Sequence, residues 1–384
     1  MSVPPETGEP VVLRIRRCAD SQSPSTVEDY SVPRRRGWSV LDALQYVKDR
    51  IDPTLSFRGS CRMGICGSCG VEVDGRPVLA CSTFVRDAVA PLSIEPMRHF
   101  PVERDLVVGL DDALGSLGEL QTYLQPADSR GPNDPPRLQT PAQLAAYKSH
   151  AMCINCMLCY SACPQYGLDD FLGPGALALA QRYNLDSRDA GSTARLERAG
   201  AEDGVWRCTV VGTCSEVCPA DVRPATAIQQ LKLASVAHAV RSLATTSASP
   251  DDAPLEPPTP SVAPKRPLSR LWWTTARSYR RYMLREASAF FTAAYAVFLL
   301  YVAVVLYAGG ATGVDQAMAV LTGPGALVLH VVALPFFALH AFSWMRIAPM
   351  LFRTTHPRAW TAVMLGIPVS LVLLVLLVIG GDWA

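Results

Sequence analysis

The cysteines of this chain constrain its fold more than any other residue type. Of the 12 cysteines, 11 fall into three tight groups, and only Cys18 stands apart. The groups are "CRMGICGSCGVEVDGRPVLAC" from Cys61, "CINCMLCYSACP" from Cys153 and "CTVVGTCSEVCP" from Cys208. The opening "MSVPPETGEP" is polar and proline-rich, so we expect no signal peptide and a reducing compartment. Clustered thiols in such a compartment indicate metal binding rather than disulfides.

The first group has the C-x4-C-x2-C spacing, with a later fourth cysteine, of plant-type [2Fe–2S] ferredoxins. The predicted ligands are Cys61, Cys66, Cys69 and Cys81. Three glycines between them, Gly64, Gly67 and Gly70, supply the permissive backbone that a loop around a cluster needs. The alternative is a zinc site, but zinc prefers two separated pairs, and this run is crowded for that.

The surroundings of this group predict a small α+β domain. The segment "VVLRIRR" alternates like a strand, and "SVLDALQYVKDRI" has helical spacing with Ser39 as its N-cap. Asp74 and Gly75 form the turn of a predicted hairpin. We therefore expect a plant-ferredoxin-like α+β (β-grasp) domain over residues 10–105.

The second and third groups share one frame, which is that of bacterial ferredoxins. In the run C-x2-C-x2-C-x3-C-P the fourth cysteine binds the other cluster of a pair. The predicted [4Fe–4S] ligands are therefore Cys153, Cys156, Cys159 and Cys218. The remaining ligands are Cys163, Cys208 and Cys214, and the slot of the missing fourth is Val211. An apolar side chain cannot hold an iron, so we expect a [3Fe–4S] cluster; the alternative is that water completes a fourth iron.

The rest of the chain is divided by composition. Residues 106–243 are expected to form the all-α bacterial ferredoxin-like domain, and 244–270, which is rich in Pro and Ser, a linker. Three long apolar runs follow at 289–308, 325–345 and 360–379, each near the roughly 20 residues that span a bilayer. Pro335 and Pro368 interrupt two of them, which membrane helices tolerate. A bundle of three transmembrane helices over 271–384 is expected, with buried helices of a soluble core as the alternative.

The charges beside these runs predict the orientation of the chain in the membrane. The segments before the first run and between the second and third runs are rich in Lys and Arg. Residues 309–324, between the first and second runs, contain one Asp and no Lys or Arg. By the positive-inside rule the first 288 residues lie in the cytoplasm and the carboxyl terminus lies outside. The net charge of +1 gives no electrostatic reason to expect nucleic acid as a partner.

Residues 10–243 resemble the iron–sulfur subunit of succinate dehydrogenase and fumarate reductase, with a leaning to the bacterial fumarate reductase branch. The segments that carry the resemblance include "SFRGSCRMGICGSCG", "CINCMLCYSACPQYG" and "VWRCTVVGTCSEVCP". Residues 271–384 are similar to the first membrane anchor subunit of that enzyme, through "YRRYMLREASAF" and "ALHAFSWMRIAP". The chain departs from the family in joining two subunits that are normally separate.

The resemblance implies a subunit of a quinol:fumarate reductase in the bacterial cytoplasmic membrane. It implies a FAD-containing flavoprotein subunit and a second three-helix anchor as partners, and menaquinone as the membrane substrate. It also implies a quinone site formed by Thr209, Gln229, Lys232, Arg285, Glu286, His340 and Trp344. Of these, Glu286 is the candidate acceptor of the quinol proton. Haem b is not expected, because the branch that the chain resembles lacks it.

Two other functions remain open at this stage. The chain could link a different dehydrogenase to the quinone pool, or it could be a non-enzymatic electron carrier or zinc-stabilised scaffold at the membrane. No G-x-G-x-x-G motif opens a strand–helix unit, so we expect no dinucleotide on this chain.

Overall fold

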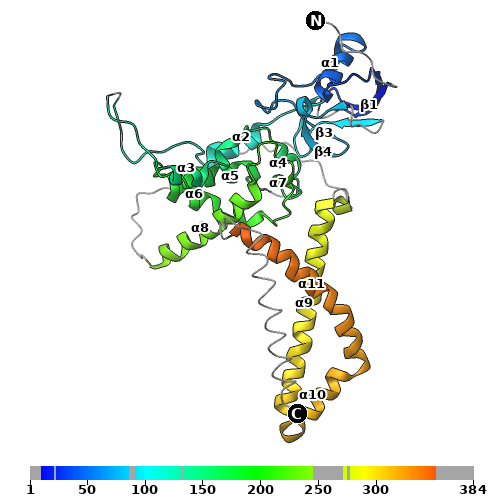
Figure 1. Ribbon diagram of the computed structural model, residues 1–384, viewed down its shortest axis with the longest axis vertical. Helices are drawn as coiled ribbons and strands as arrows, with labels where there is room; N and C mark the ends of the chain where they lie inside the picture. The colour runs from blue at the N-terminus through cyan, green and yellow to red at the C-terminus, as the bar shows by residue number, and fades with distance from the viewer. Residues whose placement is uncertain are drawn as a thin grey trace. The chain divides into compact units, whose positions relative to one another are not determined.

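The computed structural model describes residues 10–20, 23–85, 91–131, 133–168, 170–244, 271–274 and 277–351. These residues belong to two compact units, one up to Leu271 and one from Trp272, and each unit is treated by itself below. Figure 1 labels their helices and strands. Most of the expected linker, from residue 245 to 270, lies outside the described residues.

The first unit begins with a five-stranded mixed sheet in the order β2-β1-β5-β3-β4. Its strands are β1 (Val11–Arg17), β2 (Thr26–Val32), β3 (Gly70–Val73), β4 (Arg76–Leu79) and β5 (Leu92–Glu95). Strand β1 pairs antiparallel with β2 and parallel with β5, and a second sheet joins β6 (Val102–Arg104) to β7 (Val107–Val108). This mixed sheet with one helix is the expected α+β domain.

Helix α1 (Val40–Arg50) begins where the sequence predicts. The Ser39 hydroxyl accepts a hydrogen bond from the Asp42 backbone N–H, and the Asp42 carboxylate accepts one from the Ser39 N–H, which makes a capping box. The helix buries Leu41, Leu44 and Val47, so its apolar face forms the core of this domain. The predicted hairpin is also confirmed, since Asp74 and Gly75 join β3 to β4.

The rest of the first unit is helical. Its helices are α2 (Asp111–Glu119), α3 (Pro141–Tyr147), α4 (Leu158–Ser161), α5 (Pro174–Asn184), α6 (Ser192–Ala199), α7 (Thr213–Glu216) and α8 (Pro224–Ala244). Helix α8 packs against α5 and α6, and the short helices α4 and α7 contact each other. Two buried groups, Tyr160 and Leu231, belong to a core that continues into the β-rich part.

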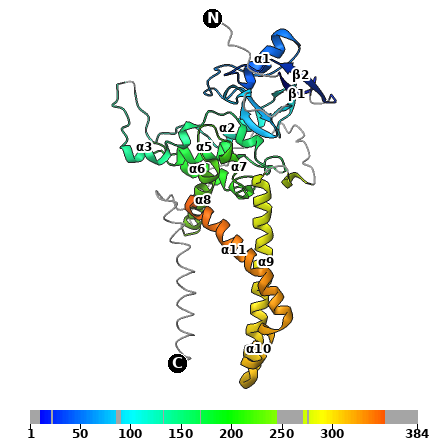
Figure 2. The same ribbon diagram turned by 45° about the vertical axis from the view of Figure 1, so that its right-hand side comes forward.

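The second unit contains two long helices, α9 (Arg277–Ala308) and α11 (Pro324–Leu351), joined through α10 (Gly313–Thr322). In both ribbon views α11 crosses α9, and α10 lies at the turn between them (Figures 1 and 2). Pro335 lies within α11, which continues past it. Helix α10 occupies a segment that was expected only as a connection between two apolar runs.

Within the described residues, two helices are long and apolar enough to span a membrane. They are Tyr279–Ala308, with a mean hydropathy of 2.3, and Pro324–Met345, with 1.9. In the part of the chain that the structure describes, their most apolar parts have little burial. The third predicted run, residues 360–379, lies outside the described residues, so the three-helix bundle stays a prediction.

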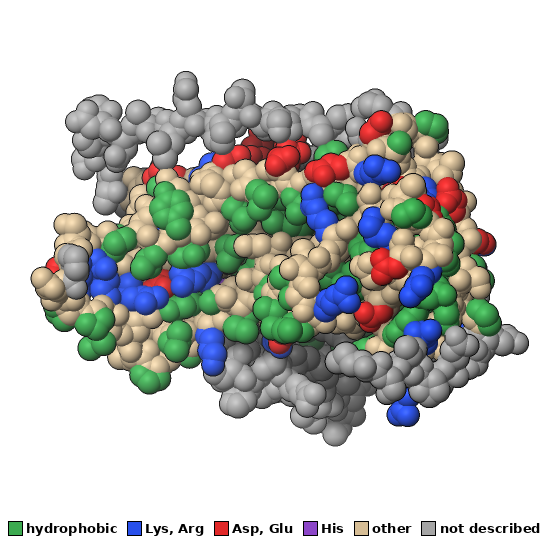
Figure 3. Space-filling view, turned by 90° about the horizontal axis from the view of Figure 1, so that it is seen from above, with side chains coloured by type: hydrophobic (Ala, Val, Ile, Leu, Met, Phe, Trp, Pro, Cys, Tyr) green, Lys and Arg blue, Asp and Glu red, His purple; other side chains and the backbone are tan. Residues whose placement is uncertain are grey.

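On the face shown in Figure 3, Lys and Arg side chains are interspersed with Asp and Glu. This mixture agrees with the balance of 35 basic and 34 acidic residues in the sequence.

Candidate iron–sulfur centres

Three cysteines of the first group, Cys61, Cys66 and Cys69, lie in the loop between α1 and β3, and Cys81 follows β4. The Cys61 sulfur accepts hydrogen bonds from the backbone N–H groups of Ile65 and Cys66, each at 3.3 Å. Cys69 lies close to both Cys66 and Cys81. Backbone N–H groups that point at sulfur stabilise a negative cluster, so the loop has the donor arrangement that a [2Fe–2S] group needs.

The charge state of these thiols differs along the loop. Hydrogen bonds from Ser68 lower the pKa of Cys66 to about 6, whereas burial raises the pKa of Cys69 to about 11. Cys66 is exposed and Cys69 is buried. Iron would displace the proton of each thiol. Its positive charge would compensate the negative charge of the buried Cys69 thiolate, which burial otherwise disfavours.

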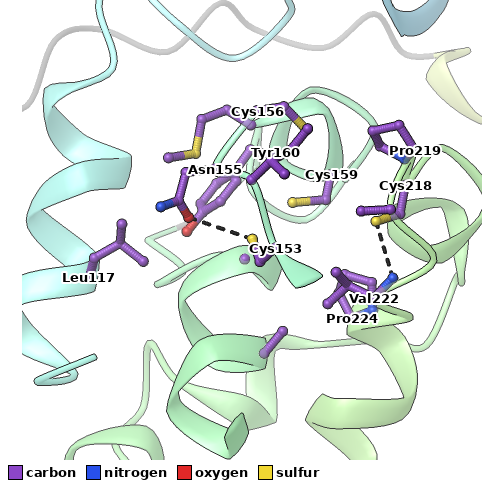
Figure 4. A pocket seen from close by; sticks show the side chains of 15 residues that line it. Leu117, Cys153, Asn155, Cys156, Cys159, Tyr160, Cys218, Pro219, Val222 and Pro224 are labelled. Atoms are coloured by element: carbon purple, nitrogen blue, oxygen red, sulfur yellow. Dashed lines mark hydrogen bonds between the residues drawn. The ribbon is translucent and has the colours of Figure 1, made fainter. Parts of the chain in front are cut away.

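Four cysteines from two distant segments line one pocket in the helical part. They are Cys153, Cys156, Cys159 and Cys218. This is the set predicted for a [4Fe–4S] cluster when the fourth cysteine of each run binds the other cluster. Figure 4 shows them around one space, with Tyr160 and Val222 beside them. The Cys218 sulfur accepts a hydrogen bond of 3.4 Å from the Val222 N–H. Most other lining residues are apolar, for example Leu117.

The donor set of this pocket suits a cluster better than a single ion. Burial raises the pKa of Cys156 to about 11 and that of Cys159 well above its ordinary value. Thiols held neutral in an apolar pocket become favourable ligands when iron supplies compensating charge. In the described part of the chain, no group of three or more Cys, His, Asp or Glu side chains could hold one metal ion. A cluster needs a wider spacing, because each thiol binds a different iron.

The second motif repeats the backbone of the first around its second slot, which is Val211. The residue before this slot has a positive φ in both motifs, 51° at Asn155 and 58° at Val210. The residue after it does so too, 59° at Met157 and 86° at Gly212. A positive φ is a genuine outlier for a β-branched residue such as Val210, so the loop geometry is imposed by the site rather than by local preference. Val211 therefore stands in the loop position of a ligand.

The other three thiols of the two motifs lie near one another. Cys163, Cys208 and Cys214 lie close enough to one another to interact electrostatically. Burial raises the pKa of Cys163 to about 12 and that of Cys214 well above its ordinary value. The structure thus brings the three predicted [3Fe–4S] ligands together.

Helix α8 directs two predicted quinone-site residues at Cys208. The Lys232 ammonium donates a hydrogen bond of 2.7 Å to the Cys208 carbonyl, and the Gln229 amide nitrogen lies 4.0 Å from its sulfur. Burial lowers the pKa of Lys232. Thr209, the third predicted residue of this unit, follows Cys208 in the chain and is half-buried.

The other four predicted quinone-site residues belong to the second unit. On α9, Arg285 donates a 3.0 Å hydrogen bond to Glu286, and its guanidinium lies 5.9 Å from the centre of the Trp344 ring. On α11, His340 lies 6.3 Å from the same ring, centre to centre. Sequence reasoning missed Ser288, whose hydroxyl lies 3.1 Å from the His340 Nδ1 and so joins α9 to α11. These four residues therefore gather on one end of the hairpin.

A second residue that sequence reasoning missed supports the four-cysteine pocket. Buried His150 has its Nδ1 3.2 Å from the Val222 carbonyl, and the N–H of Val222 donates to Cys218. Only its place three residues before Cys153 could have drawn attention to His150.

Three family models match the chain in the order of these centres. The model described as "2Fe-2S iron-sulfur cluster binding domain" matches residues 12–114, and "4Fe-4S dicluster domain" matches 149–222. The third model, which describes the C subunit of fumarate reductase, matches residues 263–379.

Curated iron–sulfur subunits match the part of the chain that carries the cysteine groups. A fumarate reductase iron–sulfur subunit of Mycobacterium tuberculosis is 52% identical over 61% of this chain and 96% of its own length. The corresponding subunit of Haemophilus influenzae is 50% identical over 56% of this chain and 88% of its own. A mitochondrial succinate dehydrogenase iron–sulfur subunit of Oryza sativa is 36% identical over 56% and 78%.

A chain in the solved structure of the Mycobacterium smegmatis Sdh1 complex in the apo form has the same fold. It is 26% identical, with a TM-score of 0.55, over 63% of this chain and all of its own. The matches to iron–sulfur subunits and to the C subunit lie in successive parts of one polypeptide. The chain therefore belongs to the family of fumarate reductase iron–sulfur subunits and continues into a domain of the fumarate reductase C-subunit family.

Proposed function

We propose that this chain carries electrons between menaquinol in the membrane and a FAD-containing subunit that reduces fumarate or oxidises succinate. The observation that carries the proposal is the pocket in which Cys153, Cys156 and Cys159 meet Cys218 from the other motif. A site built from both motifs is the arrangement of a two-cluster ferredoxin. Its presence in one chain with two helices of membrane-spanning length supports an electron-transfer and anchor role.

Each iron–sulfur group that these thiols would hold accepts and gives one electron at a time. In the proposal the residues Cys61, Cys66, Cys69 and Cys81 hold [2Fe–2S], and the pocket cysteines hold [4Fe–4S]. The ligands Cys163, Cys208 and Cys214 hold [3Fe–4S], because Val211 stands in the loop position of a fourth ligand. The protein sets the potentials through burial and hydrogen bonds to sulfur, such as the bond from Val222 to Cys218.

The proposal assigns hydrogen bonding to quinone to Lys232 of the first unit, and acceptance of the quinol proton to Glu286 of the second. Lys232 has three N–H donors in its charged form, and the Cys208 carbonyl uses one, so others can bind a quinone oxygen. Glu286 is half-exposed on α9, just before the apolar run 289–308, where a carboxylate can take a proton from quinol and pass it to water. Arg285 holds that carboxylate by an ion pair of 3.0 Å, and the Ser288–His340 contact fixes the neighbouring α11.

The proposed complex needs two further subunits and a membrane. A flavoprotein supplies FAD, and a second three-helix anchor completes the membrane part. The first turns of α9 carry Arg277, Arg280 and Arg281, while α10 carries Asp315. Under the positive-inside rule this distribution of charge supports a cytoplasmic start of α9 and an external α10 in a bacterial inner membrane.

Two experiments test the proposal. Purification of the chain from its own membranes should bring down a FAD-containing subunit and a small hydrophobic one, and the chain alone should not reduce fumarate. A single flavin-free chain that reduced fumarate with a quinol analogue would contradict the proposal.

The second experiment compares Cys159→Ser, in the pocket, with Cys18→Ser, which lies outside the three cysteine groups. The first variant should lose the [4Fe–4S] signal in electron paramagnetic resonance (EPR), and the second should keep all signals. Equal spectra of the two variants would show that the pocket thiols hold no cluster.

A further inference from the structure

The loops of the first and second cysteine groups are packed against each other with no space for a side chain between them. A Cβ added at Gly67 would lie 2.8 Å from the Ile154 carbonyl oxygen and 2.9 Å from both Cα and Cβ of Cys156. A Cβ at Gly70 would lie 2.8 Å from the Met97 sulfur and 3.3 Å from the Cys156 carbonyl oxygen. Real Cβ atoms do not approach other atoms as closely as 2.8 Å, so only glycine at 67 permits this contact.

This contact joins residues at two proposed clusters. Gly67 follows Cys66, which belongs to the [2Fe–2S] set, and the contacted Cys156 belongs to the [4Fe–4S] set. A route from one cluster to the other thus needs only Cys66, the Gly67 backbone and Cys156. The two loops belong to the same compact unit, so this contact is part of its fold.

A buried polar clamp holds the two loops together close by. The Glu72 carboxylate, on β3, accepts a 2.7 Å hydrogen bond from the Ser161 hydroxyl, at the end of α4. The Arg98 guanidinium donates another of 2.7 Å to the same oxygen. Glu72 is buried, and breaking a buried charged pair is strongly destabilising, so the clamp resists separation of β3 from α4.

We propose that Gly67 is a positioning residue that sets the gap for electron transfer between the [2Fe–2S] and [4Fe–4S] clusters. In each transfer one electron leaves one cluster, which is oxidised, and enters the other, which is reduced. Tunnelling rates fall exponentially with distance, so a shift of a few tenths of an ångström between the loops has a measurable effect. The inference rests on the proposed function, because it requires both clusters to be present.

The test is Gly67→Ala, with Gly64→Ala as its matched control. Both glycines belong to the same loop and have nearly equal positive φ values, 74° and 73°, so alanine brings similar backbone strain at each. A Cβ at Gly64 meets only the Ser82 hydroxyl at 3.9 Å, so this variant adds strain without separating the loops. Any difference between the variants therefore reports the contact.

The readout is magnetic rather than catalytic. In the fully reduced complex, the [2Fe–2S] EPR signal relaxes faster when a second paramagnetic cluster is near, which power saturation measures. Gly67→Ala should saturate at a lower power than wild type and should show slower electron transfer between the clusters after rapid mixing and freezing. Gly64→Ala should match wild type in both.

Three results would overturn the inference. They are wild-type saturation and transfer in Gly67→Ala, an equal change in both variants, and absence of the two clusters from the wild-type protein. The last result alone would also remove the proposed function, which separates the two claims. If Gly67→Ala fails to bind its clusters, the double variant Gly70→Ala/Met97→Ala decides. A Cβ at Gly70 would lie 2.8 Å from the Met97 sulfur, which the second substitution removes, and 3.3 Å from the Cys156 carbonyl oxygen, so a smaller change in the same direction is expected relative to Met97→Ala alone. Saturation in the double variant equal to that of Met97→Ala would then refute the role of the contact.

Discussion

Replacing Lys232 by methionine should slow electron entry from quinol while leaving the clusters in place. Lys232 is half-buried, and its ammonium donates a 2.7 Å hydrogen bond to the Cys208 carbonyl. Methionine keeps much of the length and apolar stem of lysine but has no N–H donor. The proposal assigns the remaining donors of Lys232 to a quinone oxygen, so the substitution removes that bond.

The size of the effect follows from the kind of bond that is lost. A hydrogen bond to a charged group contributes about 1.5–3 kcal/mol, which corresponds to a rate factor of about 10 to 150. The menaquinol-driven rate of fumarate reduction should fall by that factor. The rate from an artificial donor that reduces the clusters or flavin directly should stay near that of wild type.

Lys48→Met is the matched control. Lys48 also donates to a backbone carbonyl, that of Leu55 at 2.6 Å, but it lies on α1 in the β-rich domain. Neither rate should change in this variant. An equal fall with both donors in Lys232→Met, with an altered [3Fe–4S] signal, would mean that Lys232 only holds Cys208. An unchanged quinol rate would remove Lys232 from quinone chemistry.

Two further substitutions test the quinone and cluster assignments. Glu286→Gln keeps the shape and removes the base, so the complex should assemble with all clusters while its menaquinol-driven rate falls about 100-fold or more, as expected for a lost general base; an equal loss with an artificial donor would indicate a structural role. Val211→Cys should replace the [3Fe–4S] EPR signal by that of a four-iron cluster and impair exchange with quinone, because the loop at 211 has the backbone of the Cys156 loop; an unchanged [3Fe–4S] signal would show that this slot does not decide the iron count.

The cysteine spacing carried most of what could be predicted. Spacing paired Cys218 with the first motif, and the structure places it in the pocket of Cys153 and Cys159. Local rules also succeeded where one segment decides the outcome, as at the Ser39 cap and the Asp74–Gly75 turn. These features depend on neighbours in the chain, which a sequence displays directly.

Features that depend on contacts between distant segments could not be predicted. Gly67 was recognised as flexible backbone, but its contact with Cys156 depends on how two separate loops dock. The Ser288–His340 contact likewise depends on which faces of α9 and α11 meet. Helix α10 was missed because its 10 residues form a short segment between two longer apolar runs.

The most direct test of the account follows the [3Fe–4S] signal of the purified complex through one cycle. The oxidised complex should show this signal, because Val211 supplies no ligand. A menaquinol analogue should remove the signal by reducing the cluster, and fumarate added afterwards should restore it. A signal that quinol leaves unchanged, or that fumarate fails to restore after quinol has removed it, would contradict the claim that this chain connects the quinone pool to fumarate.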